Sequence, residues 1–300
     1  MEKTFVASSI AIKKILYATD FSKYSDAALP FALSLARKYR SKVFAVHVLS
    51  LLPFPKISLT QASQALAAQA LREAAEAMRL VEARCKSVPH ESLILKGSVW
   101  SELSRMVRDE HIDLLVLGTH GRTGVSKVLM GSVAEEIYRQ APCPVLTVGP
   151  NVAAEPESVG DIHSILYPTD FTPESLAAAP YAVSLAREND ARLYLLHIAE
   201  NPVTGTVQEA LTSRLLDLAP EEAGLCCAPK AIVDFGVPAE KIAELAEELW
   251  IDLIVLGPRR KPALPGASHL PEASANRVVS RAICPVLTVR EGGPHSRSEG

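Results

Sequence analysis

The 300-residue chain repeats itself once, and this internal repeat limits the possible folds more than any other feature of the sequence. A stretch that begins ILYATDFS recurs 150 residues later as ILYPTDFT, with close to half of its positions identical. Two shorter blocks, IDLLVLG and CPVLTV, recur further on in the same order. The paired segments are Ile15–Val48 with Ile165–Ile198, Ile112–Gly118 with Ile251–Gly257, and Cys143–Val148 with Cys284–Val289. Since chance does not produce three matching blocks in one order, we expect two copies of one domain.

The repeat also predicts the domain boundaries. We expect a first domain over residues 1–150 and a second over residues 161–291. Residues 151–160 are rich in Pro, Glu, Ala and Ser and are typical of a linker. The last residues, 292–300, are expected to form a disordered tail.

Composition and charge exclude several classes of function. Apolar residues make up 48% of the chain and charged residues 22%, so each copy can bury a core. The net charge is −3 with acids and bases mixed, whereas a nucleic-acid groove would need a clustered basic face. We expect no membrane span, because no apolar run approaches about 20 residues. The N-terminal stretch lacks a basic region and a cleavage site, so no signal peptide is expected.

The five cysteines, Cys85, Cys143, Cys226, Cys227 and Cys284, match no zinc-binding spacing. Cys226 and Cys227 form a vicinal pair rather than a C-x-x-C motif. The cysteines are interpreted as reduced thiols of a cytoplasmic protein.

Strand and helix signals alternate along each copy. In the first copy, strands are expected at 14–19, 43–49, 92–96, 113–118 and 145–149, and helices at 25–39, 60–84, 100–110 and 132–140. Nearly continuous apolar strands between helices indicate an α/β fold with a parallel sheet covered on both faces. Each copy is therefore predicted to be a doubly wound five-stranded domain with strand order 3-2-1-4-5. Ligands bind such sheets where the order reverses, here between the end of strand one at Thr19-Asp20 and the end of strand four at Gly118.

A glycine-rich loop follows strand four and leads to Gly131-Ser132 at the start of a helix. Its sequence from Gly118 is GTHGRTG. Glycines let backbone N–H groups approach an anion, and a helix N-terminus adds free N–H donors. The loop is neither a Walker A motif nor a dinucleotide-binding G-x-G-x-x-G. A phosphate-binding loop and a purely structural strand-to-helix connection both stay open on these residues alone.

The spacing Gly118-x2-Gly121-x9-Gly131-Ser132 resembles the ATP-binding signature of the universal stress protein family. YATDFS, the HV of strand two, LGTHGRTG and APCPVLTV are also similar to motifs of that family. The resemblance covers nearly the whole chain, as a tandem two-domain member with an adenine-nucleotide-hydrolase-like fold. It implies that Gly118, Gly121, Gly131 and Ser132 bind the phosphates of ATP. It further implies Asp20 near the ribose or an accompanying Mg or Mn ion, with Thr19 beside it, and Val48 near adenine.

Other polar residues of the first copy have weaker assignments. Arg122 is kept as a possible phosphate contact, although an exposed loop arginine explains it nearly as well. His47 and His197 are interpreted as packed strand residues. Asp113 and Asp252 are expected to cap the turn into strand four. His120 has no activated nucleophile beside it in sequence, so we predict no catalytic set and no metal site built by the protein alone.

The second copy lacks the glycine loop. Pro258-Arg259-Arg260 follows Gly257, and alignment from the shared CPVLTV puts Glu272 at the place of Gly131 and Ala273 at that of Ser132. A carboxylate there would repel phosphates, and the prolines of this loop remove N–H donors. Ser274 lies one position further on, so an alignment shifted by one residue stays open. We expect one nucleotide per chain.

Three functions are compatible with these patterns. The first is a regulatory ATP-binding protein that is not an enzyme and acts on unidentified protein partners in a stress response. The second is an interaction module that works without nucleotide, and the third is a slow ATPase or adenylyl-transfer relative. Family members pair through their last strands, so Pro144–Gly149 and Pro285–Arg290 are expected to pair within the chain as a pseudo-dimer. Whether two chains pair further stays open.

Overall fold

A computed structural model describes residues 10–50, 61–119, 134, 136–137, 140–152, 162–257 and 272–290. The first copy alternates strands and helices as expected, and most bounds fall within two residues of the prediction. Its elements are β1 (Lys14–Ala18), α1 (Lys23–Tyr39), β2 (Lys42–Leu49), α2 (Gln61–Cys85), β3 (His90–Lys96), α3 (Val99–Asp109), β4 (Leu114–Gly118) and β5 (Val145–Val148). The helix predicted over 132–140 lies largely outside the described residues.

The second copy repeats this order, with shorter counterparts of α1 and α2. Its elements are β6 (Ser164–Pro168), α5 (Pro173–Leu176), α6 (Ala179–Glu188), β7 (Arg192–Ala199), α7 (Thr206–Leu216), η1 (Glu221–Ala223), β8 (Lys230–Phe235), α8 (Pro238–Glu248), β9 (Leu253–Leu256), α9 (Glu272–Arg281) and β10 (Val286–Thr288). Where the first copy has the single helix α1, the second has α5 and α6 in succession.

The strands of both copies form one ten-stranded sheet. Their order is β3-β2-β1-β4-β5-β10-β9-β6-β7-β8, so each copy has the predicted order 3-2-1-4-5. All neighbours within a copy are parallel, while β5 and β10 pair antiparallel, with Leu146 opposite Leu287. The expected pairing of the two last strands is confirmed, and each shields the edge of the other.

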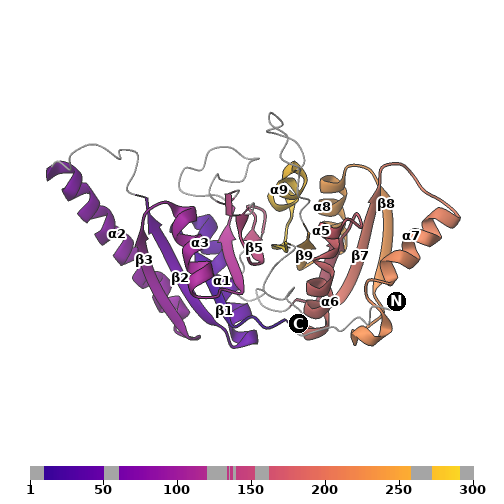
Figure 1. The fold of residues 1–300 in the computed structure, drawn as a ribbon, viewed down its shortest axis with the longest axis horizontal. Coiled ribbons are helices and arrows are strands. Elements are labelled where there is room, and N and C mark those ends of the chain that lie inside the picture. The colour runs from indigo at the N-terminus through magenta and orange to yellow at the C-terminus, as the bar shows by residue number, and fades with distance from the viewer. Residues whose placement is uncertain are drawn as a thin grey trace.

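Helices cover both faces of this sheet (Figure 1). One buried apolar cluster joins α1, α2 and α6 to one face, and a second joins α3, α8 and α9 to the other. Each strand contributes to both clusters, because consecutive side chains of a strand point to opposite faces. Each cluster draws residues from both copies, because the sheet is continuous across β5 and β10. Tyr17 and Tyr167, the largest fully buried side chains, occupy equivalent positions in the first cluster.

Three non-glycine residues with left-handed backbone in the first copy have counterparts in the second. Phe21 (φ 62°) matches Phe171 (φ 61°) after the first strand. The other two pairs follow helices: Arg40 with Asp190, and His111 with Trp250. Since such φ values are uncommon outside glycine, their recurrence indicates that the two copies share turn geometry as well as sequence.

Side chains as well as strands join the two copies. Tyr39 Oη donates to Glu188 Oε2 at 2.7 Å, and the Ile10 N–H donates to Glu188 Oε1 at 3.1 Å. On the other side of the sheet, Asn151 Nδ2 donates to the carbonyls of Ser280 and Arg281 at the end of α9. We call the β5–β10 pair together with these contacts the seam.

Candidate functional site

The turn after β1 is built by the hydroxyl of Thr19. The Thr19 N–H donates to the Val46 carbonyl at 2.9 Å, which extends the sheet by one residue. Thr19 Oγ1 accepts from the Phe21 N–H at 3.0 Å and lies 3.1 Å from Ser25 Oγ. Thr19 is buried, so its hydroxyl is used to hold the turn against the first turn of α1.

Asp20 is half-buried at the carboxyl end of β1, where the strand order reverses. Its Oδ1 accepts from the Ser22 N–H at 3.1 Å, which orients the carboxylate by an Asx-type turn. Ser22 in turn caps α1, because its side chain accepts from the Ser25 N–H. The start of α1 is therefore stabilised by its own cap.

His47 packs beneath this turn. It is buried, its Nδ1 donates to the Thr19 carbonyl at 2.8 Å, and its ring lies 4.4 Å from that of Phe21. His197 has the same hydrogen bond to Thr169, at 2.9 Å. Both histidines are thus packed strand residues, as the sequence predicted.

Gly118 lies where α1 passes closest to β4. A Cβ at Gly118 would come within 2.4 Å of the Tyr24 carbonyl oxygen, a distance that real Cβ atoms do not tolerate. Gly257 meets the Glu174 carbonyl oxygen in the same way, at 2.1 Å. Close packing of helix on strand therefore requires glycine in both copies, whatever else Gly118 does.

The sheet register brings the predicted residues of β1 and β4 to one level. Tyr17 lies opposite Val116, and two more residues along each strand put Thr19 beside Gly118. Val48 lies on the neighbouring strand β2 at the same edge. The remaining predicted contacts, Gly121, Arg122, Gly131 and Ser132, lie outside the described residues, as does His120.

The second copy builds the same turn with the same atoms. Thr169 Oγ1 accepts from the Phe171 N–H at 3.0 Å and lies 2.9 Å from Ser175 Oγ. Asp170 Oδ1 accepts from Thr172, from its N–H at 2.9 Å and from its hydroxyl at 2.6 Å. The described framework is thus present in both copies. The predicted differences fall on residues 258–271, outside the described part, and on Glu272 and Ala273, of which only the backbone helix is described.

Asp113 and Asp252 stabilise the opposite end of the sheet. Asp113 Oδ2 accepts from the N–H groups of Lys13 and Lys14, at 2.8 and 2.9 Å. Asp252 Oδ2 accepts from His163 and Ser164 in the same way, both at 2.9 Å. Their role is structural, as expected, but they fix the start of the first strand rather than the turn into the fourth. The partners are about 100 residues apart and meet only because of the strand order, so local sequence patterns do not predict this contact.

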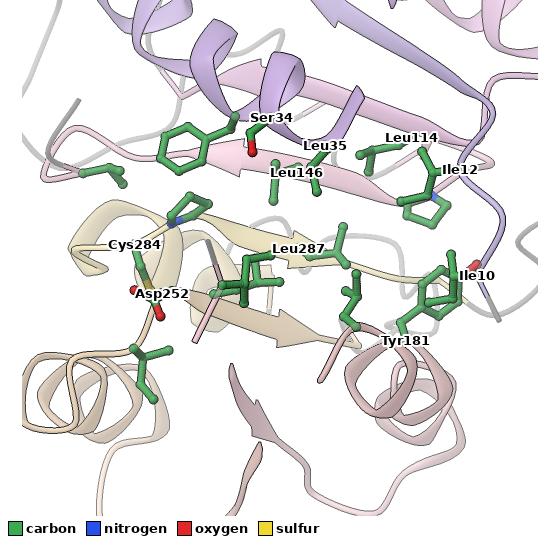
Figure 2. A pocket seen from close by; sticks show the side chains of 18 of the residues that line it. Ile10, Ile12, Ser34, Leu35, Leu114, Leu146, Tyr181, Asp252, Cys284 and Leu287 are labelled. Carbon is green, nitrogen blue, oxygen red and sulfur yellow. The ribbon is translucent and has the colours of Figure 1, made fainter. Parts of the chain in front are cut away.

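A cavity of about 440 Å³ lies at the seam, away from the predicted crevice. Figure 2 shows Leu146 and Leu287 of the paired strands facing it, with Leu35 of α1 and Tyr181 of α6 at its sides. Thr19, Asp20, Val48 and Gly118 do not line it. Its lining is mainly apolar and comes from both copies, so it belongs to the contact between them.

Neither a membrane-spanning helix nor a protein-built metal site is found in the described part of the chain. No described helix is both long and apolar enough to span a bilayer. Among these residues, no three or more His, Cys, Asp or Glu side chains group so as to hold a metal ion.

Two doubly wound domains in tandem, each with strand order 3-2-1-4-5, define the class of protein. The sequence model of the universal stress protein family matches residues 11–149 and 161–290. The chain therefore belongs to the universal stress protein family, and it carries the family domain twice.

Individual relatives agree with this assignment. Universal stress protein MJ0531 of Methanocaldococcus jannaschii is 31% identical over 138 residues, which are 45% of this chain and 81% of the relative. A universal stress protein of Thermus aquaticus is 30% identical over 139 residues, 45% of this chain and 98% of that one. The structure of a universal stress protein from Archaeoglobus fulgidus shares the fold over both copies, with a TM-score of 0.65 at 19% identity and coverage of 92% and 98%.

Proposed function

We propose that this protein is a regulatory ATP-binding protein of the stress response, with one nucleotide site in its first copy. ATP would lie in the crevice between β1 and β4, with Thr19 and Asp20 near the ribose or a Mg or Mn ion and Val48 near adenine. Gly121, Arg122, Gly131 and Ser132 would hold the phosphates together with the backbone of Gly118. Occupancy would change the conformation or the choice of partner rather than drive turnover.

The observation that carries the proposal is the meeting of three strand ends at one edge of the sheet. Thr19 and Gly118 are level across β1 and β4, and Val48 is the next-to-last residue of the adjacent strand β2. In open α/β sheets this reversal point is where ligands bind. The sequence that continues from Gly118 is the one with the spacing of the family's ATP signature.

Two features of the described residues support the proposal of a nucleotide site. Asp20 is half-buried and held by the Ser22 N–H, so a carboxylate is presented at the crevice without reorganisation. His47 and Thr19 are buried and hydrogen-bonded to each other, so they form the floor. The Ser22 side chain already caps the start of α1. We therefore propose that the phosphates are bound by N–H groups of the glycine loop and not by those of α1.

The second copy is proposed to have kept the floor of the site and lost its phosphate loop. Thr169, Asp170 and Gly257 are arranged as in the first copy. The loop that follows has Arg260 in place of Gly121 and Glu272 in place of Gly131. A carboxylate facing the phosphates disfavours binding through like charge.

The direct test is Gly131→Glu, which copies the second domain into the first. ATP binding, followed by calorimetric titration, is expected to fall below detection, while circular dichroism and the thermal unfolding midpoint stay as in the wild type. Titration with AMP and cyclic AMP shows whether the phosphate chain supplies the affinity. If Gly131→Glu binds ATP as tightly as wild type, the site assignment is wrong.

Glu272→Gly is the matched control, since it makes the reciprocal change in the second copy. We expect it to leave ATP affinity at the first site unchanged. If the affinity is unchanged, the loss of binding in Gly131→Glu is due to residue 131 itself and not to a Gly/Glu exchange at the equivalent place in either copy.

An interaction module that needs no nucleotide is the alternative. One observation favours it: the second copy keeps the framework of the crevice although its loop is altered. Protein that releases no nucleotide on denaturation and binds none in titration would fit this alternative. Under either function we expect a reducing cytoplasm, in keeping with five free cysteines.

A further inference from the structure

Two adjacent thiols stand at the surface of the second copy, outside the crevice and the seam. Cys226 and Cys227 lie in the loop between η1 and the edge strand β8, and both are exposed. Their Sγ atoms are 3.5 Å apart, and Cys226 Sγ also lies 3.8 Å from the Ala191 carbonyl oxygen. The two sulfurs therefore point to the same side of the loop.

A disulfide bond between Cys226 and Cys227 is geometrically unfavourable. Consecutive Cα atoms are about 3.8 Å apart, whereas disulfide-linked residues usually have Cα atoms about 4.4–6.8 Å apart. A disulfide between neighbours is therefore strained and easily reduced. In a reducing compartment the pair stays as a dithiol.

A single atom that bridges the two sulfurs fits the distance better. With bonds to sulfur of about 2.3 Å, the length found for zinc thiolates, sulfurs 3.5 Å apart subtend roughly 100° at the bridging atom. This angle excludes ions that hold two thiolates in a line. A structural zinc ion needs four ligands, and the described residues provide no third His, Cys, Asp or Glu for a cluster here.

We infer that Cys226 and Cys227 form a binding site for trivalent organic arsenic compounds. Trivalent arsenic keeps one carbon substituent and a lone pair, so it offers two positions for sulfur in a pyramidal arrangement near this angle. With phenylarsine oxide, both S–H groups give up their protons and two As–S bonds replace the As–O bond. One water leaves and arsenic stays trivalent, so neither an oxidant nor a reductant is needed.

The remaining three thiols do not compete. Cys85, Cys143 and Cys284 are buried. Burial raises the pKa of Cys85 to about 11 and those of Cys143 and Cys284 to about 12. The hydrogen bond with Cys227 raises the pKa of Cys226 as well, so solvent access, more than thiolate fraction, makes the exposed pair react first.

The test is to treat the reduced full-length chain with phenylarsine oxide and weigh the intact protein. We expect one phenylarsenic group per chain, which resists excess 2-mercaptoethanol but is removed by 2,3-dimercaptopropanol. Cys226→Ser and Cys227→Ser should each lower apparent affinity in the presence of the monothiol by about 10²- to 10⁴-fold, because each loses the second linked bond. Cys85→Ala is the control and should keep the monothiol-resistant adduct.

Three results would overturn the inference. The first is a wild-type adduct that the monothiol removes, and the second is a resistant adduct on either serine variant. The third is a mass decrease of two hydrogens when the chain is equilibrated with reduced and oxidised glutathione at cytosolic potential. That decrease would show that Cys226 and Cys227 form a disulfide under these conditions. None of these results depends on whether the chain binds ATP.

Discussion

At the residue scale, Gly118 illustrates how a glycine that the sequence assigns to a binding loop can be required by packing. The sequence marks it as the first glycine of a phosphate loop, yet the structure shows that α1 leaves no room for a Cβ there. Gly257 has the same constraint in the copy that is proposed to bind no nucleotide. Glycine at the end of the fourth strand is thus required by packing in both copies.

Gly118→Ala and Gly257→Ala are therefore both expected to destabilise the protein, by about 1–3 kcal/mol each, through overpacking against helix backbone. Chemical denaturation measures the effect. A cost at Gly118 with none at Gly257 would show that packing is not the common cause.

The cysteines give a second prediction at this scale. An aromatic disulfide reagent at pH 8 should modify Cys226 and Cys227 rapidly in the folded chain, and the three buried cysteines only on unfolding. With a pKa of about 11, Cys85 is thiolate in only about one molecule in a thousand at pH 8. Three or more fast thiols by absorbance would contradict the burial described above.

At the scale of elements, the hydrogen bond from Tyr39 of α1 to Glu188 of α6 joins helices from different copies. Tyr39→Phe removes it from a carboxylate that is only 15% exposed, so we expect a loss of about 1.5–3 kcal/mol in the free energy of unfolding at neutral pH. Tyr194→Phe removes a tyrosine hydroxyl away from the seam and serves as the control.

The difference in the free energy of unfolding between wild type and Tyr39→Phe should become smaller above pH 10. Burial and the Glu188 carboxylate raise the pKa of Tyr39 well above its ordinary value of 10.0. Its stabilising contribution is present below the unfolded pKa and declines as the unfolded chain loses the proton. Denaturation curves at pH 8 and pH 10.5 check this, and a constant difference would contradict it.

Sequence reasoning predicted the elements well because they depend on local apolar patterns and on the repeat. Strand order and the pairing of β5 with β10 followed from crossover rules and from the resemblance. Contacts such as Asp113 with Lys13, or Tyr39 with Glu188, join residues about 100 to 150 positions apart and leave no local pattern. Packing of Gly118 against Tyr24 was missed for the same reason.

For the whole molecule, the seam makes one ten-stranded sheet from two copies. Because both apolar clusters continue across it, we expect wild type to unfold in one cooperative transition by calorimetry. Val286 in β10 is only 1% exposed. Val286→Asp places an uncompensated charge there and should lower the free energy of unfolding by about 3–5 kcal/mol. This variant should show two transitions, with the second copy melting first. Two transitions in wild type would mean that the copies are not coupled.

The central claim is that only one of two similar crevices holds a nucleotide. Calorimetric titration of the full-length chain with ATP and Mg²⁺, at a protein concentration above the Kd, tests it most directly, because the stoichiometry counts occupied sites without any variant. The account predicts one ATP per chain. Two ATP per chain would contradict the proposed loss in the second copy, and no binding would contradict the proposed function.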